Sequence, residues 1–234
     1  MKYNFQARTN SEKFATKIYN LLVENFPQTF FVGGMVRDLM LNKKVVDIDL
    51  ATEAKPTAIV KILGHEGVKY DAHFARFGNI LAGNKPNQVA ITTFRKDLPS
   101  NGRYPKVIFT KSPKIDSQRR DFTINALYLS LKTKKILDFH HGLKDLGTKT
   151  IRFIGNPVNR INQDPLRILR ALRFALTLNF KFEKKTFTAL GENLSKIERL
   201  SQNKINSEIA KIPNERNKKT FLEFISAKNR LTKF

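Results

Sequence analysis

The chain has 234 residues, of which 41% are hydrophobic and 19 are Phe, enough for the core of one large or two small domains. Its 43 Lys and Arg against 20 Asp and Glu give a formal net charge of +23, which predicts a polyanionic partner without identifying it. The lack of Cys excludes disulfides, thiolate zinc sites and a cysteine nucleophile, and no apolar run approaches the roughly 20 residues of a membrane span.

Helical and extended patterns alternate in the first part of the sequence. Apolar residues at helical spacing predict a helix over residues 11–26, ending before Pro27. A short buried strand is expected over 29–32, the first turns of a helix over 36–41, and a strand over 45–51. Further on, Pro56 favours the first turn of a helix that continues over 58–63.

Gly33 and Gly34 lie between the first strand and the helix that follows it. Glycine lets a backbone approach a ligand closely, and the free N–H groups and dipole at a helix start favour a phosphate group. Arg37 would add a charged donor. The alternative is a strand, turn and helix in which the glycines form a flexible hinge and Arg37 and Asp38 are surface charges.

Asp47 and Asp49 flank Ile48 in the second predicted strand. Because side chains alternate along a strand, both carboxylates are expected on one face, with Ile48 buried on the other. Two carboxylates fit Mg²⁺, and two such ions can hold both the attacking and the leaving oxygen of an in-line phosphoryl transfer. The alternative is a solvated strand edge or turn without a metal.

Extended segments at 68–70, 77–81, 89–94 and 107–110 predict further strands of a single sheet. A helix is expected over 122–126 and a hairpin over 128–139, and from residue 162 onward the pattern is mostly helical and basic. The predicted fold class is therefore α+β, with a mixed or antiparallel sheet flanked by helices, followed by an all-helical part.

Two further segments combine arginine with acidic residues. Arg119, Arg120 and Asp121 precede the helix predicted at 122–126, and the alternative is a basic surface turn with Asp121 as an N-cap. Asp164 and Arg167 lie one turn apart, where Asp164 would cap a helix whose first position is Pro165. This pair could read a base edge by hydrogen bonds, and the alternative is a cap and an intrahelical ion pair.

In this order, the segments 33–38, 47–49, 119–127 and 160–174 resemble the class II tRNA nucleotidyltransferases, the CCA-adding enzymes, and their bacterial poly(A) polymerase relatives. The resemblance runs from about residue 29 to residue 175. It implies a nucleotidyltransferase head domain over residues 1–150 and a helical neck over 151–234 that binds RNA and selects the nucleotide. We expect the body and tail domains of relatives to be shortened or absent.

The resemblance implies template-independent addition of CMP and AMP, from CTP and ATP, to the 3′ end of tRNA, with Mg²⁺ as the cofactor. In the family, the acids that match Asp47 and Asp49 hold the catalytic metals, and the pair that matches Asp164 and Arg167 selects CTP and ATP. The other residues predicted to bind nucleotide are Gly33, Gly34, Arg37, Arg119, Arg120, Asp121, Asn125, Arg170 and Arg173.

Two residues depart from the family pattern. Ala90 stands where many relatives carry an acid, which removes a candidate third metal ligand. Gln163 replaces the usual Glu beside the pair that selects the nucleotide.

The loop at 101–105 resembles the flexible loop of enzymes that add the terminal A, which favours CCA addition over CC addition. The alternatives are an A-adding enzyme or poly(A) polymerase, and a non-catalytic RNA-binding relative. Because residues 1–13 lack the apolar core of a signal peptide, we expect a cytoplasmic protein without membrane segments.

Overall fold

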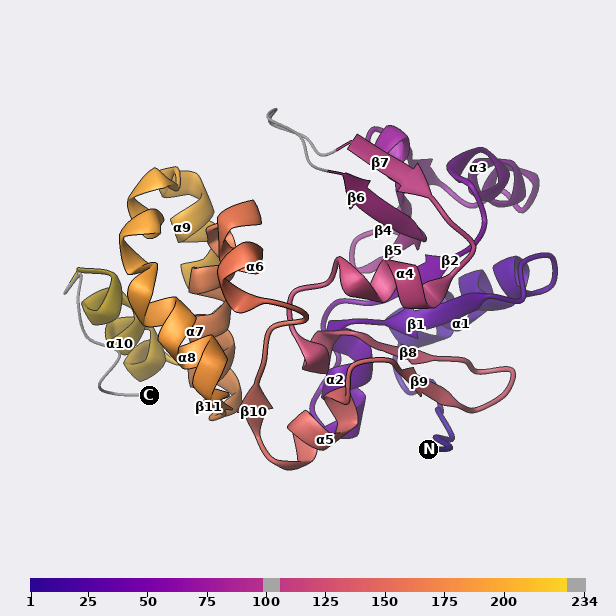
Figure 1. Ribbon diagram of the computed structural model, residues 1–234. Coiled ribbons are helices and arrows are strands. Elements are labelled where there is room, and N and C mark those ends of the chain that lie inside the picture. The colour runs from indigo at the N-terminus through magenta and orange to yellow at the C-terminus, as the bar shows by residue number, and fades with distance from the viewer. Residues whose placement is uncertain (99–105, 227–234) are drawn as a thin grey trace. The chain divides into compact units, whose positions relative to one another are not determined.

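A computed structural model describes residues 1–98 and 106–226 of the chain (Figure 1). The loop predicted at 101–105 lies outside these residues. The chain divides into two compact units, one made of Met1–Arg120 and Asn125–His140, the other of Asp121–Ile124 and His141–Phe234.

A seven-stranded mixed sheet forms the centre of the first unit, in the order β3-β4-β5-β2-β1-β8-β9 (Figure 1). Strands β2 and β5 pair parallel, whereas the other neighbours pair antiparallel. The strands are β1 (Thr29–Val32), β2 (Asp49–Thr52), β3 (Tyr70–Asp71), β4 (Asn79–Asn84), β5 (Asn87–Thr93), β8 (Leu127–Leu129) and β9 (Ile136–Asp138). The mixed sheet and the hairpin of β8 and β9 confirm the predicted α+β class.

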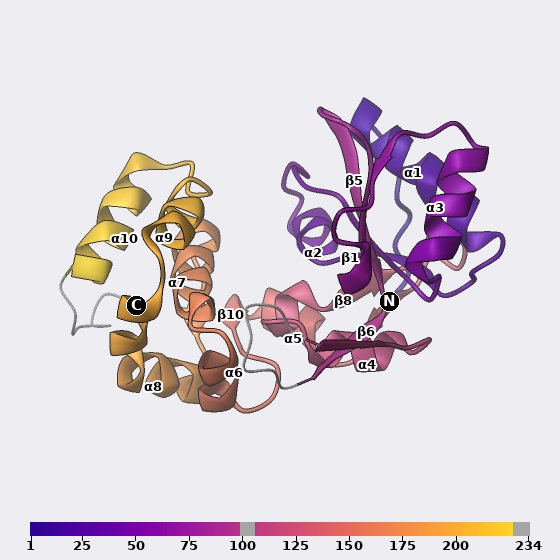
Figure 2. The ribbon, with the colours of Figure 1, turned by 90° about the horizontal axis from the view of Figure 1, so that it is seen from above.

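Two helices, α1 (Asn10–Val23) and α3 (Pro56–His65), pack on one face of this sheet (Figure 2). A capping box starts α1, since Thr9 accepts a hydrogen bond from the backbone of Glu12 and the Glu12 side chain accepts one from the backbone of Thr9. Tyr19 of α1 stacks on Phe31 of β1 with ring centroids 5.4 Å apart. The helix α2 (Gly34–Met40) contacts β1 and β8.

The opposite face of the sheet is partly apolar and partly open. A buried cluster on this face consists of Phe30, Val32, Ala51, Phe94 and Tyr128. Val32 is the register partner of both Asp49 and Tyr128, and cross-strand partners share a face. On the other side of Asp49, the partners Ala90 and Leu81 are only half-buried. Asp49 therefore lies where the buried cluster meets the accessible part of the sheet.

The prediction of one continuous sheet was wrong for residues 107–110. β6 (Arg95–Leu98) and β7 (Lys106–Phe109) form a separate antiparallel pair (Figure 1). Strand β5 already has β4 and β2 as neighbours, so the chain that leaves it finds no free edge beside it. The short helix α4 (Pro113–Gln118), which the sequence did not predict, follows this pair and contacts β6.

The helix predicted over residues 122–126 is also absent from the described structure, where only a 3₁₀ turn forms at Thr123–Asn125. Phe122 and Phe153 form an isolated antiparallel bridge, and their rings lie 4.8 Å apart. The Thr123 N–H donates to the carbonyl of Arg152 at 3.0 Å. These bonds use the backbone groups that a helix would need.

Helices dominate the second unit, with one short parallel strand pair beside them. The central helix α7 buries Leu169 and Leu172 and contacts α6, α9 and α10. The elements are α5 (Gly142–Gly147), β10 (Thr150–Ile151), α6 (Pro157–Gln163), α7 (Leu166–Leu178), β11 (Lys181–Phe182), α8 (Lys184–Glu192), α9 (Gln202–Ile209) and α10 (Glu215–Ser226). The predicted boundary between residues 150 and 151 falls within β10, and the assignment of head and neck stays a prediction.

No helix in residues 1–98 and 106–226 is both long enough and apolar enough to cross a membrane.

Candidate active site

Gly33 brings three parts of the first unit together. It precedes α2 with φ +71°, a conformation that favours glycine, and its carbonyl accepts the Arg37 N–H at 3.2 Å. A Cβ built on Gly33 would lie 3.5 Å from both Asp49 Oδ2 and Arg120 Nη1. A glycine turn, a carboxylate and a guanidinium therefore converge on one point.

The alternation expected for the paired acids is present, although β2 begins later than predicted. The strand starts at Asp49 rather than at residue 45, but Ala90 N–H donates to the Ile48 carbonyl at 3.1 Å, so pairing extends one residue further. Ile48 is buried, Asp47 is exposed and Asp49 is half-buried. This pattern of exposure agrees with the expected alternation, and the placement of the Asp47 carboxylate on the face of Asp49 stays a prediction, because Asp47 precedes β2.

The set of candidate metal ligands around Asp49 is small. Ala90 is the register partner of Asp49, and within the described ranges no cluster of three His, Asp or Glu side chains could hold a metal. Mg²⁺ usually takes one or two protein carboxylates and completes its shell with water and substrate phosphate oxygens, so Asp47 and Asp49 have the chemistry for this ion and their binding of it stays a prediction.

Arg37 is not the surface charge of the alternative interpretation, because it is only 9% exposed. Its Nε and Nη2 donate to the two carboxylate oxygens of Asp38 at 2.8 and 2.9 Å. Its Nη1 donates to Asn125 Oδ1 at 2.7 Å. Arg37 thus ties α2 to the turn that contains Asn125, and its contact with a triphosphate stays a prediction.

Arg119 and Arg120 are held by a fully buried carboxylate that the sequence did not reveal as part of the site. Arg119 Nε donates to Asp116 Oδ1 at 2.8 Å, and Arg120 Nη2 donates to Asp116 Oδ2 at 3.2 Å. The Tyr128 hydroxyl donates to Asp116 Oδ2 at 2.7 Å and accepts Arg120 Nε at 2.8 Å. The helical spacing of Asp116 from the two arginines is the signal that could have found it.

The charges in this network reinforce one another. Burial alone would raise the pKa of Asp116, but Arg120 and Arg119 outweigh it and hold this pKa below its ordinary value. Burial and the neighbouring Asp116 raise the pKa of Tyr128. Burial acts to lower the pKa of Arg120, yet Tyr128 and Asp116 raise it overall. At neutral pH the network therefore consists of a carboxylate, guanidinium cations and a neutral phenol.

In the second unit, Asp121 binds Arg170 on α7. Arg170 Nε and Nη2 donate to Asp121 Oδ2 at 2.7 and 2.5 Å, while Asp121 Oδ1 accepts the Phe122 N–H at 2.8 Å. Burial would lower the pKa of Arg170, but Asp121 raises it. Asp121 therefore differs from Arg119 and Arg120 in its contacts, because it links the segment that follows Arg120 to α7.

Asp164 and Arg167 lie at the start of α7. The prediction of Asp164 as the helix cap was wrong, because α7 begins at Leu166 with Pro165 as its N-cap, although Asp164 Oδ1 accepts the Leu166 N–H at 3.1 Å. Arg167 Nη1 donates to the Arg160 carbonyl at 2.7 Å and to Gln163 Oε1 at 3.2 Å. Both side chains are half-buried. Base selection by this pair stays a prediction.

Arg173 lies in the interior of the second unit. Its Nε donates to Glu208 Oε2 at 2.7 Å, and Lys211 Nζ donates to Glu208 Oε1 at 2.7 Å. Glu208 is 1% exposed and Arg173 is 9% exposed. This position favours a structural role for Arg173, joining α7 to α9, over a contact with nucleotide.

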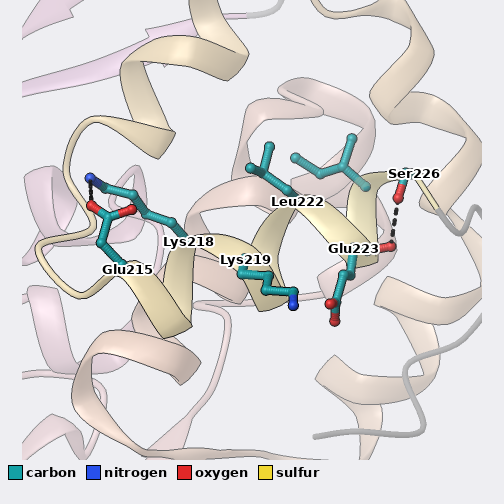
Figure 3. Close-up of a pocket in the computed structure, with 7 residues that line it drawn as sticks. Glu215, Lys218, Lys219, Leu222, Glu223 and Ser226 are labelled. Carbon is teal, nitrogen blue, oxygen red and sulfur yellow. Dashed lines mark hydrogen bonds and ion pairs between the residues drawn. The ribbon is translucent and has the colours of Figure 1, made fainter.

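The predicted site residues divide between the two units. Gly33, Gly34, Arg37, Asp47, Asp49, Arg119, Arg120 and Asn125 belong to the first unit, and Asp121, Asp164, Arg167, Arg170 and Arg173 belong to the second. A shallow pocket along α10 contains none of them (Figure 3). Its lining consists of Glu215, Lys218, Lys219, Leu222, Glu223, Ile225 and Ser226.

Comparison with known proteins identifies the family of this chain. Residues 29–152 match the family model described as the Poly A polymerase head domain. The CCA-adding enzyme of Enterococcus faecalis is 40% identical over 79% of this chain and 45% of its own length. That of Streptococcus mutans is 40% identical over 74% of this chain and 43% of its own length.

Solved structures show the same similarity. The Bacillus stearothermophilus CCA-adding enzyme in complex with CTP has a TM-score of 0.77 and 29% identity over 88% of this chain and 49% of that chain. The Thermotoga maritima CCA-adding enzyme complexed with tRNA has a TM-score of 0.75 and 26% identity over 95% of this chain and 52% of that chain. The chain therefore spans about half the length of the curated relatives that it matches. It covers 45% of the Enterococcus faecalis enzyme, for example.

Proposed function

The chain belongs to the family of class II tRNA nucleotidyltransferases and bacterial poly(A) polymerases that shares the Poly A polymerase head domain, and from this premise we propose that it extends RNA 3′ ends. The proposed reaction is addition of CMP and AMP, from CTP and ATP, to the 3′ end of tRNA. The observation that carries this proposal is the closeness of Asp49 and Arg120 to the turn at Gly33, because the carboxylate would hold a metal ion and the guanidinium and the glycine turn would hold phosphates.

The chemistry needs no nucleophilic side chain. The 3′-hydroxyl of the RNA attacks the α-phosphate of the nucleotide, and pyrophosphate leaves. Asp47 and Asp49 would hold Mg²⁺, which when bound neutralises charge on the phosphates and the leaving group. The turn at Gly33 would let the backbone approach a triphosphate, and Arg120 adds positive charge beside that turn.

Selection of the base is assigned to the start of α7. Asp164 and Arg167 offer an acceptor and a planar donor group one turn apart, the combination that hydrogen bonding to a base edge requires. Arg170 holds Asp121 in place and so supports this helix from the segment that follows Arg120.

The relatives support the proposed partners. Solved structures of relatives include complexes with CTP, with a primer tRNA and an ATP analogue, and with tRNA. We therefore propose CTP, ATP and the tRNA 3′ end as the partners here, with action in the cytoplasm, where tRNA is used. A-only addition and poly(A) synthesis are the alternative activities within the same family.

Incorporation of labelled nucleotides tests the proposal. CTP and ATP are supplied separately and together, with Mg²⁺, to tRNA ending before CCA, to tRNA ending at CC, and to an unrelated RNA. We expect CTP and then ATP to be added to the first RNA, ATP alone to the second, and nothing to the third. Addition of ATP alone to every RNA would instead identify a poly(A) polymerase.

Two variants make the result specific to the site. Asp47→Ala should abolish incorporation while the protein stays folded, because it removes one of the two carboxylates. Asp71→Ala, which removes an exposed aspartate from β3 of the same unit, should leave incorporation unchanged. Binding of RNA without incorporation by the unmodified chain would point to the non-catalytic RNA-binding relative.

A further inference from the structure

Asp116 is the most completely enclosed acid of the first unit that the reaction does not use directly. Its side chain is 0% exposed. Four groups donate to it: Arg119 Nε, Arg120 Nη2, the Tyr128 hydroxyl and the backbone N–H of Arg95, the last at 3.2 Å. A buried charge with this many donors is held in one orientation, and in turn it fixes the groups that donate to it.

The arrangement fixes Arg120 from two sides. Its Nη2 binds Asp116, and its Nε binds the Tyr128 oxygen, which itself donates to the same oxygen of Asp116. The guanidinium also lies over the Tyr128 ring, with its central carbon 5.0 Å from the ring centroid. With Nε and Nη2 held in this way, Nη1 points to the corner where Gly33 and Asp49 meet.

We propose that Asp116 is a positioning residue for nucleotide binding, which acts through Tyr128 and Arg120 and makes no contact with the nucleotide itself. The inference deepens the proposed function and rests on it. A guanidinium that is already held in place loses less side-chain entropy when a phosphate binds than a free one does. The preorganised arginine therefore raises the affinity for the nucleotide. Arg119, held by the other carboxylate oxygen, is positioned by the same residue.

Asp116 also reaches beyond the two arginines. Asp116 accepts a hydrogen bond from the backbone N–H of Arg95, the first residue of β6. This strand begins where the chain leaves the central sheet. Burial, with Arg119 beside it, holds the pKa of Arg95 below its ordinary value, and the Arg95 side chain donates to Asp97 and to the Phe77 carbonyl. A change at Asp116 is therefore expected to loosen the start of β6 together with the two arginines.

Two variants test the positioning role. Asp116→Asn keeps the shape of the side chain but removes its charge, and Tyr128→Phe removes only the hydroxyl that joins Asp116 to Arg120. The measurement is the dissociation constant for CTP with Mg²⁺ and without RNA, by titration calorimetry. We expect weakening of roughly tenfold for Asp116→Asn, which removes the charge that both arginines bind, and a smaller weakening for Tyr128→Phe, which leaves the direct bond between Arg120 and Asp116 in place.

A matched control separates positioning from general loss of stability. Glu12→Gln makes the same change in a buried, hydrogen-bonded carboxylate of α1, away from the arginines. It should lower the melting temperature without changing CTP affinity. CTP affinity equal to wild type in a folded Asp116→Asn or Tyr128→Phe protein overturns the inference. Where Asp116→Asn does not fold, Tyr128→Phe alone decides.

A second readout does not depend on the nucleotide. In nuclear magnetic resonance spectra, the Arg120 Nε–H should exchange slowly with solvent in the wild type and much faster in Tyr128→Phe. Slow exchange in both proteins overturns the positioning role. Absence of CTP binding by the wild type, together with the expected exchange result, would overturn the proposed function and leave the network intact.

Discussion

Asp49 of β2 and Ala90 of β5 are register partners on neighbouring parallel strands. Register partners present their side chains on one face of a sheet, so the Ala90 methyl group lies on the face that carries the Asp49 carboxylate. Ala90 is half-buried, on the accessible side of Asp49. It is therefore the position where one added carboxylate would join the two already present.

We expect Ala90→Glu to tighten divalent cation binding. A third carboxylate adds negative charge and one more oxygen ligand, and both raise the affinity of a hard cation. The Mg²⁺ concentration that gives half-maximal incorporation should fall roughly threefold to tenfold. Binding of Mn²⁺ in the absence of nucleotide, followed by electron paramagnetic resonance, should strengthen in parallel.

Gln88→Glu is the control for this substitution. It adds the same charge to the same face of β5, but its register partner is Gly83 rather than Asp49. Only the change at Ala90 should alter cation binding. An equal effect in both variants would mean that net charge, and not a ligand beside Asp49, is responsible.

Gly33→Ala should reduce both stability and nucleotide affinity. The residue has φ +71°, which an alanine adopts only with strain of about 1–3 kcal/mol, and the added methyl would lie against Asp49 and Arg120. Urea unfolding would measure the first effect and CTP titration the second. Gly64→Ala is the matched control, because Gly64 lies within α3 with open space where its Cβ would be, and it should gain roughly 0.5–1 kcal/mol. Similar results for the two glycines would contradict the special role of Gly33.

The spacing of apolar residues predicted those features of the fold that depend only on neighbouring residues in the sequence. The bounds of β1 match the prediction, and the alternation around Ile48 is present, because both follow from burial on a strand. The segments after β5 and after Arg120 were missed, because competition for a sheet edge and the bridge between Phe122 and Phe153 are not local properties. Family resemblance, and not spacing, identified Arg119 and Arg120 as site residues.

Asp116 marks the limit of sequence reasoning in the site itself. Its spacing from Arg119 and Arg120 is visible in the sequence, but its two other donors, the Tyr128 hydroxyl and the backbone N–H of Arg95, come from other elements. An acid near two arginines is ordinary in a chain with 43 Lys and Arg. Only complete burial separates this carboxylate from an exposed ion pair.

Acid should destabilise the protein in part through Glu208. Burial would raise its pKa, but Lys211 and Arg173 lower it overall, so the folded state binds this proton less readily than the unfolded chain. The stabilisation is therefore complete above the unfolded pKa of about 4.3 and is lost as pH falls through the lower pKa of the folded state.

The Glu208→Gln variant tests this assignment. It should lose about 1–3 kcal/mol at pH 7, because Arg173 and Lys211 keep a neutral acceptor in place of a charged one. Its unfolding free energy, measured in urea from pH 7 to pH 3, should fall less steeply with acid than that of the wild type. Glu215→Gln changes an exposed carboxylate paired with Lys218 and should alter neither value measurably. Parallel pH curves for wild type and Glu208→Gln would exclude Glu208 as a source of acid sensitivity.

Gln163 lies between two arginines near the proposed base-selecting pair. Its Oε1 accepts Arg160 Nη1 at 2.7 Å and Arg167 Nη1 at 3.2 Å. In both hydrogen bonds to the neutral amide oxygen only the donor is charged. A carboxylate at this position would turn both into ion pairs.

We therefore expect Gln163→Glu to stabilise the start of α7 and to sharpen nucleotide selection. The stability gain should be only about 0.2–1 kcal/mol, because Gln163 is exposed to solvent. Firmer placement of Arg167 should raise the preference for CTP over UTP by roughly twofold to fivefold, measured as the ratio of kcat/KM values. Asn162→Asp adds the same charge one position earlier on α6 and should leave this ratio unchanged. If Gln163→Glu stabilises the protein but leaves the ratio at its wild-type value, Arg167 is a structural residue of the helix start and the base is selected elsewhere.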